Sequence, residues 1–111
     1  MSSASAAIAA LNDDLRRTLS GGRVLNTAGV DAFDARLQAR IVEAVRSFDS
    51  FTSDNDPHGE HDFGSIEVEG HRVFFKIDYY ESGTNFSAGA ERPEVQATTD
   101  RVLTIMLAEE Y

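Results

Sequence analysis

The feature that most constrains the fold is the alternation of apolar residues on both sides of Gly70-His71. Ile66 and Val68 alternate with glutamates before this dipeptide, and apolar residues recur at every second position after it. Period-two alternation is typical of a strand with one buried face, and a glycine-containing pair between two such runs indicates a tight turn. The sequence therefore predicts a β-hairpin over residues 65–81. A turn at Gly70-His71 would pair Val68 with Val73 and Ile66 with Phe75.

The segments before the hairpin predict two helices and one short strand. Apolar residues recur every three or four positions from residue 5 to Leu19, which indicates an amphipathic helix that ends at Gly21-Gly22. Residues 23–27 are rich enough in β-branched residues for a strand. Asp31 is a good N-cap for a second helix that runs to residue 48. The buried face of that helix is expected to contain Phe33, Leu37, Ile41, Val45 and Phe48.

A third helix is predicted near the C-terminus. Pro93 suits the first position of a helix, Glu94 suits its positive end, and the following residues form a wide apolar face. We expect that face to contain Val95, Val102, Leu103, Ile105, Met106 and Leu107. The predicted order is α-β-α-β-β-α, which defines an α+β domain with a three-stranded sheet packed against helices. Residues 5–111 form this single domain, and residues 1–4 form a flexible N-terminus.

Charge is distributed unevenly along the 111 residues. Residues 1–48 carry six arginines and five acids, whereas residues 49–111 carry four basic residues and fourteen acids. Between Arg46 and Arg72 there are seven acids and no lysine or arginine. Such a surface must be solvated, bind a cation or face a basic partner. Direct binding to nucleic acid is disfavoured, because phosphates repel an acidic protein.

Other features of the composition narrow the cellular setting. The chain has no cysteine, which excludes disulfides and thiolate chemistry and fits a reducing compartment. No apolar run is long enough to span a bilayer, and the first ten residues lack the pattern of a signal peptide. The expected location is therefore the cytoplasm, with no membrane association.

The segment from Asp54 to Asp62 has side chains that suit metal ions. Asp54, Asp56 and His58 precede Gly59 with the spacing that opens a calcium-binding loop, but position twelve is Ser65 rather than glutamate. A transition metal is a second possibility, and no established ligand spacing supports it. The candidate ligands are Asp54, Asp56, His58, Glu60, His61 and Asp62. The simpler interpretation is a polar turn whose side chains cap their own backbone, and no cofactor is expected.

Enzymatic chemistry has weak support in the sequence. His61 is flanked by carboxylates, and Ser53 and Ser65 are conceivable nucleophiles. No nucleophile elbow, phosphate-binding loop or dinucleotide fingerprint accompanies them. We therefore assign no catalytic residue. A small metal-dependent enzyme remains the alternative to a non-enzymatic interaction protein.

Several segments together resemble a known family. The most specific is RVLTIMLAEEY at the C-terminus, and the others are IAALNDDLRRTL, VLNTAGV, DNDPHGEHDFG and VFFKIDYY. The likeness runs from Ile8 to Tyr111. These segments resemble a bacterial family of small proteins known only as a domain of unknown function. The resemblance implies a setting on plasmids and other mobile elements, beside anti-restriction genes, and it supplies no catalytic residues.

These observations favour a non-enzymatic protein that presents an acidic surface to a basic partner. In the setting that the resemblance implies, the partner would be a host defence protein whose basic groove normally holds nucleic acid. Two aromatic residues, Tyr80 at the end of the hairpin and Phe86 in the segment after it, are free to contact the same partner. The predicted partner-binding residues are Asp54, Asp56, Glu60, Asp62, Glu67, Glu69, Tyr80 and Phe86.

Overall fold

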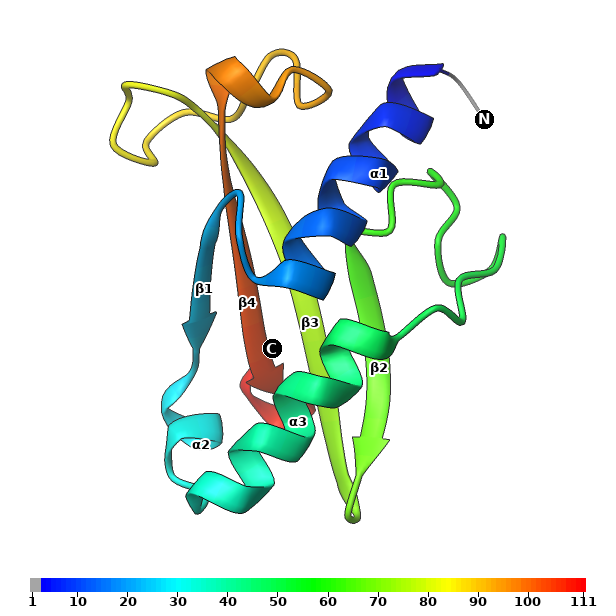
Figure 1. The fold of residues 1–111 in the computed structure, drawn as a ribbon, viewed down its shortest axis with the longest axis vertical. Helices are drawn as coiled ribbons and strands as arrows, with labels where there is room; N and C mark the ends of the chain where they lie inside the picture. The colour runs from blue at the N-terminus through cyan, green and yellow to red at the C-terminus, as the bar shows by residue number, and fades with distance from the viewer. Residues whose placement is uncertain (1–2) are drawn as a thin grey trace.

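The computed structural model describes residues 3–111, and the helices and strands occupy most of that range (Figure 1). The elements are α1 (Ser3–Thr18), β1 (Arg23–Asn26), α2 (Ala28–Asp31), α3 (Ala35–Ser47), β2 (Phe63–Val68), β3 (His71–Glu81), the 3₁₀ helix η1 (Gln96–Thr98), β4 (Thr99–Leu107) and the 3₁₀ helix η2 (Ala108–Glu110). Of the flexible terminus predicted for residues 1–4, residues 1–2 lie outside the described part, and α1 begins at Ser3.

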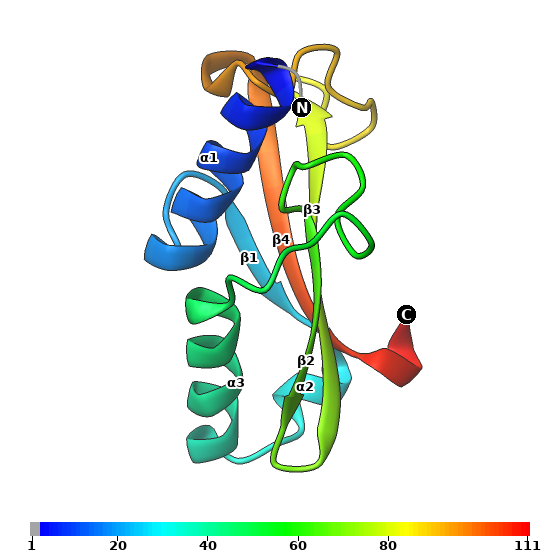
Figure 2. The same ribbon diagram turned by 90° about the vertical axis from the view of Figure 1, so that its right-hand side faces the viewer.

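The strands form one four-stranded sheet in the order β1-β4-β3-β2. Strand β1 is parallel to β4, and the other neighbours are antiparallel. Helices α1 and α3 cover one face of the sheet, whereas the loop after β3 and the C-terminal η2 lie toward the other face (Figures 1 and 2). The α+β class is confirmed. The predicted sheet of three strands is wrong, because a fourth strand lies at its centre.

That fourth strand is β4, where the sequence pattern predicted a C-terminal helix. Ile105 faces the main core beside Phe75, and its neighbour Met106 is buried on the opposite side of the sheet. A central strand with both faces covered has a nearly continuous apolar run, and such a run has no period that separates it from a buried helix. Pro93 precedes the short η1 instead of opening a long helix.

The hairpin between β2 and β3 is confirmed, with a turn one residue earlier than predicted. Glu69 and Gly70 occupy the turn with φ values of 49° and 83°. Positive φ at both central residues is typical of a type I′ turn, which suits the twist of a hairpin. Val68 therefore pairs with His71, and Ile66 pairs with Val73 rather than with Phe75. The shift of two positions keeps every side chain on its predicted face.

Helix α3 starts later than predicted and is fixed at both ends. The separate short helix α2 precedes it, and Asp34 rather than Asp31 is its N-cap, accepting a 2.8 Å hydrogen bond from the backbone N–H of Leu37. At its C-terminal end, the guanidinium of Arg16 donates to the carbonyl oxygens of Val45 (3.1 Å) and Phe48 (2.5 Å). A cation at this end also interacts favourably with the helix dipole. Arg16 thus ties α1 to α3.

The main core lies between the sheet and the two helices. It contains Leu15 of α1, the α3 residues Leu37, Ile41 and Val45, and the sheet residues Val68, Val73, Phe75, Ile77, Leu103 and Ile105, together with Val30 of α2. All five residues predicted for the buried face of the second helix pack here, as core or at its edge, although Phe33 lies in the turn before α3. Within residues 3–111, no helix has the length and apolarity needed to cross a membrane.

Candidate functional site

The first candidate site is the acidic loop, which we define as residues 49–62 between α3 and β2. The loop lies beyond β2, on the side of the sheet away from β1 (Figure 1). One of its two histidines, His61, fixes the loop to α1, because its Nδ1 is 3.0 Å from Asp13 Oδ1. The His61 imidazole also stacks on Phe51, with ring centroids 4.0 Å apart and an interplanar angle of 2°. The carboxylate of Asp56 accepts a hydrogen bond from the backbone N–H of His61. The loop is therefore packed against the domain by its own side chains.

Four acids of this loop have no lysine or arginine as an ion-pair partner. In the described part of the chain, no lysine or arginine nitrogen lies within 4 Å of the carboxylates of Asp54, Asp56, Glu60 or Asp62. Partial burial raises the pKa of Asp62, and repulsion from Glu60 and Asp56 raises it further. Negative charge is thus crowded in this loop. Asp54 is exposed, whereas Asp56 is 8% exposed.

The two acids predicted on the hairpin do not join this cluster. Glu69 lies in the β2–β3 turn and pairs with Arg36 at 2.7 Å and Arg40 at 3.2 Å. The hydrogen bond from Arg36 lowers the pKa of Glu69. Glu67 is exposed on β2, 3.9 Å from Arg72. The sequence could not show the first pairing, because its arginines come from α3, more than twenty residues earlier in the chain.

The candidate metal ligands do not converge. Over residues 3–111, no group of three or more histidine, cysteine, aspartate or glutamate side chains has an arrangement that could hold a metal ion. His58 is exposed on the loop surface, while His61 lies between Asp13 and Asp56. The metal-site hypothesis stays a prediction from the sequence.

The second candidate site is the side of the sheet that α1 and α3 leave open. Tyr80 and Phe86 lie there, with their rings in an edge-to-face arrangement 5.7 Å apart, and the Arg23 guanidinium is 5.1 Å from the centre of the Phe86 ring. A cavity of about 250 Å³ opens beside them on this face. It is lined by Arg23, Leu25, Lys76, Asp78, Tyr80, Phe86, Val102 and Thr104. Tyr80 and Phe86 therefore pack against each other, and they lie on a different surface from the acidic loop. Their role in binding a partner stays a prediction.

A buried hydrogen-bond chain links the acidic loop to the interior near β4. The Tyr79 hydroxyl donates to Glu60 Oε1 at 2.9 Å, and Asn12 Nδ2 donates to the Tyr79 oxygen at 2.8 Å. Asn12 Oδ1 accepts from Arg101 Nε at 3.0 Å. We call Glu60, Tyr79, Asn12 and Arg101 the polar chain. Burial is the main reason that the pKa of Tyr79 is raised, so its hydroxyl stays a neutral donor.

Sequence reasoning missed two members of the polar chain, Asn12 and Arg101. Asn12 lies on α1 among apolar positions and is fully buried, and Arg101 is 1% exposed within an apolar strand. The sequence offers one signal, which is an arginine within an apolar segment. Arginine is almost never fully buried without partners, so a buried Arg101 requires hydrogen-bond acceptors around it. Its partners come from residues 12, 93 and 96, which only the tertiary fold brings together.

The chain is thus a small α+β domain with an acidic loop and an open sheet face. A model of the family described as "Protein of unknown function (DUF3768)" matches residues 26–110, and the chain belongs to this family. The resemblance to a family of unknown function is therefore confirmed. No curated protein and no solved structure shows significant similarity to the chain.

Proposed function

We propose that this protein is a non-enzymatic inhibitor that binds a basic protein surface through its acidic loop. The observation that carries this proposal is the crowding of Asp56, Glu60 and Asp62, whose carboxylates lack a lysine or arginine partner in the described chain. Burial raises the pKa of Asp62 most, and repulsion from Glu60 and Asp56 raises it further. Like charges held together oppose each other in the free protein. An arriving lysine or arginine relieves that repulsion, so the cluster favours a cationic partner.

The partner in this proposal is a host defence protein that grips nucleic acid in a basic groove, as in restriction or CRISPR systems. An acidic loop that occupies such a groove competes with phosphates for the same cations. A mobile-element origin and a cytoplasmic location accompany this proposal. No cofactor and no direct contact with nucleic acid are required.

Within the acidic loop, the proposed contacts are Asp54, Glu60 and Asp62. Asp56 carries negative charge but also accepts the backbone N–H of His61, so its main part is to shape the loop. Tyr80 and Phe86 add a separate apolar contact on the open sheet face. Glu67 and Glu69 contribute less, because arginines of this chain already lie beside them.

The test is protection of invading DNA in cells. Bacteria with a restriction or CRISPR system would express the wild-type protein or the triple variant D54N/E60Q/D62N, and phage plating efficiency would be measured. We expect the wild type to raise plating efficiency and the triple variant to lose most of that effect. Complementary charge acts first on the association rate, so binding to the captured defence protein should also weaken as salt increases.

The matched control is D31N/E43Q/E91Q, which changes the net charge equally at exposed sites outside the acidic loop. It should protect as well as the wild type. Equal loss of protection in both triple variants would show that net charge alone matters. Tight binding of the wild type to naked DNA would contradict the proposal, as would partner binding that is independent of salt and of the three loop acids.

A further inference from the structure

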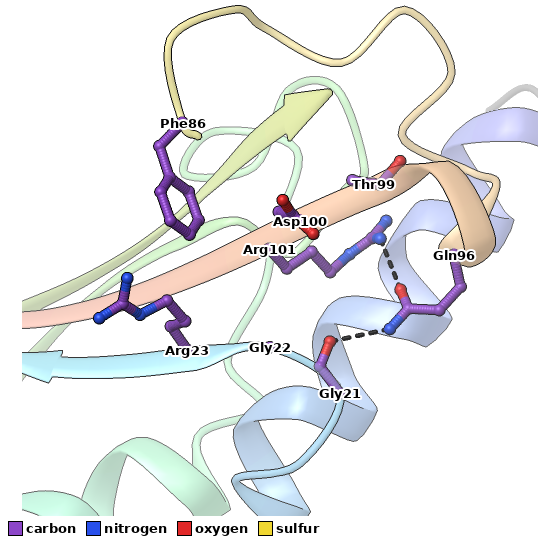
Figure 3. A pocket seen from close by; sticks show the side chains of 8 residues that line it. All are labelled: Gly21, Gly22, Arg23, Phe86, Gln96, Thr99, Asp100 and Arg101. Carbon is purple, nitrogen blue, oxygen red and sulfur yellow. Dashed lines mark hydrogen bonds between the residues drawn. The ribbon is translucent and has the colours of Figure 1, made fainter. Parts of the chain in front are cut away.

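A second cavity lies where β1 begins beside β4, and its composition differs from that of the acidic loop. The cavity has a volume of about 320 Å³ and is formed by the Gly21-Gly22 backbone, η1 and the start of β4, with Phe86 at one side (Figure 3). Two arginines line it, Arg23 and Arg101, against a single acid, Asp100. This part of a strongly acidic protein is therefore locally cationic.

Neither arginine of the cavity has a carboxylate partner. In the described chain, no Asp or Glu oxygen lies within 4 Å of the side-chain nitrogens of Arg23 or Arg101. The carboxylate of Asp100 accepts from the Ser82 hydroxyl at 3.2 Å instead. The other fully buried arginine, Arg16, does have such a partner, because Asp13 lies 2.7 Å from it.

In the described chain, the hydrogen bonds of the Arg101 guanidinium go to neutral oxygens, and the group also lies over the Tyr79 ring at 5.4 Å. It donates to Asn12 Oδ1 at 3.0 Å, to Gln96 Oε1 at 2.8 Å and to the carbonyl of Pro93. A buried cation without a counter-ion is costly, since desolvation is not repaid by an opposite charge. An anion that reaches this group would gain a charge-assisted hydrogen bond in a partly desolvated site.

The amide of Gln96 occupies the position where such an anion would bind. Its Oε1 accepts from Arg101, while its Nε2 donates to the Gly21 carbonyl at 2.8 Å, and Figure 3 shows this bridge across the cavity. Gln96 is exposed, so its side chain can move aside without opening the core. Gly22 keeps the backbone close to β4, because a Cβ there would lie 2.7 Å from the Arg101 carbonyl oxygen.

We propose that this cavity binds a small molecule whose carboxylate or phosphate group replaces the Gln96 amide beside Arg101. Arg23 and the Phe86 ring lie together at the other side of the cavity, where they would contact the rest of the molecule (Figure 3). Asn85 and Phe86 have φ values of 54° and 63°, a conformation that is uncommon for a bulky side chain. The contacts of Phe86 with Tyr80 and Arg23 hold the ring in this place.

The experiment follows the Arg Nε–Hε and backbone amide signals of the full chain by NMR during titration with four anions. The probes are inorganic phosphate, phenyl phosphate, acetate and benzoate, each compared with sodium chloride at equal ionic strength. We expect saturable shifts at Arg101 Nε–Hε and at the Gly22 and Arg23 amides. The phosphate and carboxylate series separate the two sources of anion, and the ring-bearing member of the preferred series should bind more tightly.

Three variants make this test specific. Gln96→Glu places a carboxylate of the protein itself beside Arg101, and we expect it to weaken anion binding by about tenfold or more. Arg23→Gln should weaken binding by severalfold, while Phe86→Ala should remove the advantage of the ring-bearing probe. Arg17→Gln removes an exposed cation of α1 as a control and should leave binding unchanged.

The same titrations can overturn the proposal. Shifts that stay linear and match those of chloride for all four probes would mean that no anion site exists. Saturable shifts that are equal in the wild type, folded Gln96→Glu and Arg23→Gln would place the anion elsewhere. This inference is independent of the acidic-loop function, because the variants that test it leave Asp54, Glu60 and Asp62 unchanged.

Discussion

The two ends of the polar chain carry opposite and uncompensated charges. At one end, Glu60 lies among the crowded acids of the acidic loop, and at the other, Arg101 lies buried without a carboxylate. Tyr79 and Asn12 separate them, and both are neutral. The comparison teaches that the polar chain keeps these two charges apart, whereas other charges of the fold, such as Arg16 and Asp13, form ion pairs. In the described chain, neither end of the polar chain has an ion-pair partner of opposite charge within 4 Å.

Of the two neutral residues, Asn12 makes most of the hydrogen bonds that keep Glu60 and Arg101 apart. Asn12 donates to the Glu60 carbonyl at 3.0 Å and to the Tyr79 oxygen at 2.8 Å, and it accepts from Arg101. An aspartate at position 12 would pair with the arginine, and a lysine would attract the glutamate. An amide does neither, yet it satisfies donors and acceptors on both sides. The polar chain is therefore a hydrogen-bonded spacer between the two candidate sites.

The largest effect is expected when that spacer is removed. Asn12→Leu leaves Arg101 Nε, the Tyr79 hydroxyl and the Glu60 carbonyl with one partner fewer each, in buried or partly buried positions. Each lost partner costs about 1–3 kcal/mol, so we expect a loss of about 4 kcal/mol in the free energy of unfolding. Urea denaturation measures it. Asp14→Leu, at an exposed position of α1, is the control, and equal losses in both variants would refute the spacer role.

The two buried arginines should respond differently to the same substitution. Arg16→Met removes the donors to the end of α3 and leaves Asp13 without its guanidinium, which should cost about 3 kcal/mol. Arg101→Met leaves only neutral acceptors behind and removes a desolvated charge, so about 1–2 kcal/mol is expected. Both values come from urea denaturation, with Arg17→Met as an exposed control near zero. A costlier loss at Arg101 would contradict the view that its charge is uncompensated.

Neutralising an acid of the crowded loop should stabilise the domain. Because the folded-state pKa of Asp62 is raised, its charged form is penalised at neutral pH. The penalty disappears as the pH falls through the raised pKa to below the ordinary pKa of aspartate, where the carboxyl is protonated in both states. Asp62→Asn should therefore raise Tm at pH 7 by a few degrees, about 0.5 kcal/mol after allowance for solvent screening at this half-buried site. Thermal melts at pH 7 and pH 3 would show whether the gain is confined to the higher pH.

The smallest effect is expected at an acid that already has partners. Glu69→Gln removes exposed ion pairs with Arg36 and Arg40, and such pairs contribute little because water and salt screen them. The substitution should lower Tm slightly in low salt and leave it unchanged in 1 M salt. Opposite signs for Asp62→Asn and Glu69→Gln at pH 7 would sharpen the distinction between unpaired and paired acids. A stabilising effect of Glu69→Gln would remove that distinction.

The sequence predicts the local features of this fold well and the long-range ones poorly. Helix α3 and the hairpin have clear periods, and even the shifted turn leaves the core residues on their predicted faces. Strand β4 was missed because its residues are buried on both sides, so Leu103 and Met106 face different environments without any alternation in polarity. The residues that flank β4 in the sequence do not reveal which element covers its second face.

The same reasoning explains the outcome for the candidate sites. The acidic loop is visible in the sequence, because its acids lie close together along the chain with no lysine or arginine among them. The pairing of Glu69 and the burial of Arg101 depend on residues from distant elements, which no local pattern records. The separation of Tyr80 and Phe86 from the acidic loop likewise follows from the tertiary fold, because Tyr80 points to the open face of the sheet and Phe86 packs on it there.

The most direct test of the account is an NMR titration of the Asp62 carboxyl carbon. The central claim is that the acidic loop holds crowded carboxylates that lack a lysine or arginine partner. Burial raises the pKa of Asp62 most, and the further rise caused by Glu60 and Asp56 reports this crowding. We predict a pKa above the ordinary range of aspartate, and a lower value in Glu60→Gln, where one repelling charge is removed. A pKa of Asp62 at or below the ordinary range, unchanged by Glu60→Gln, would show that the loop is already neutralised and would contradict the account.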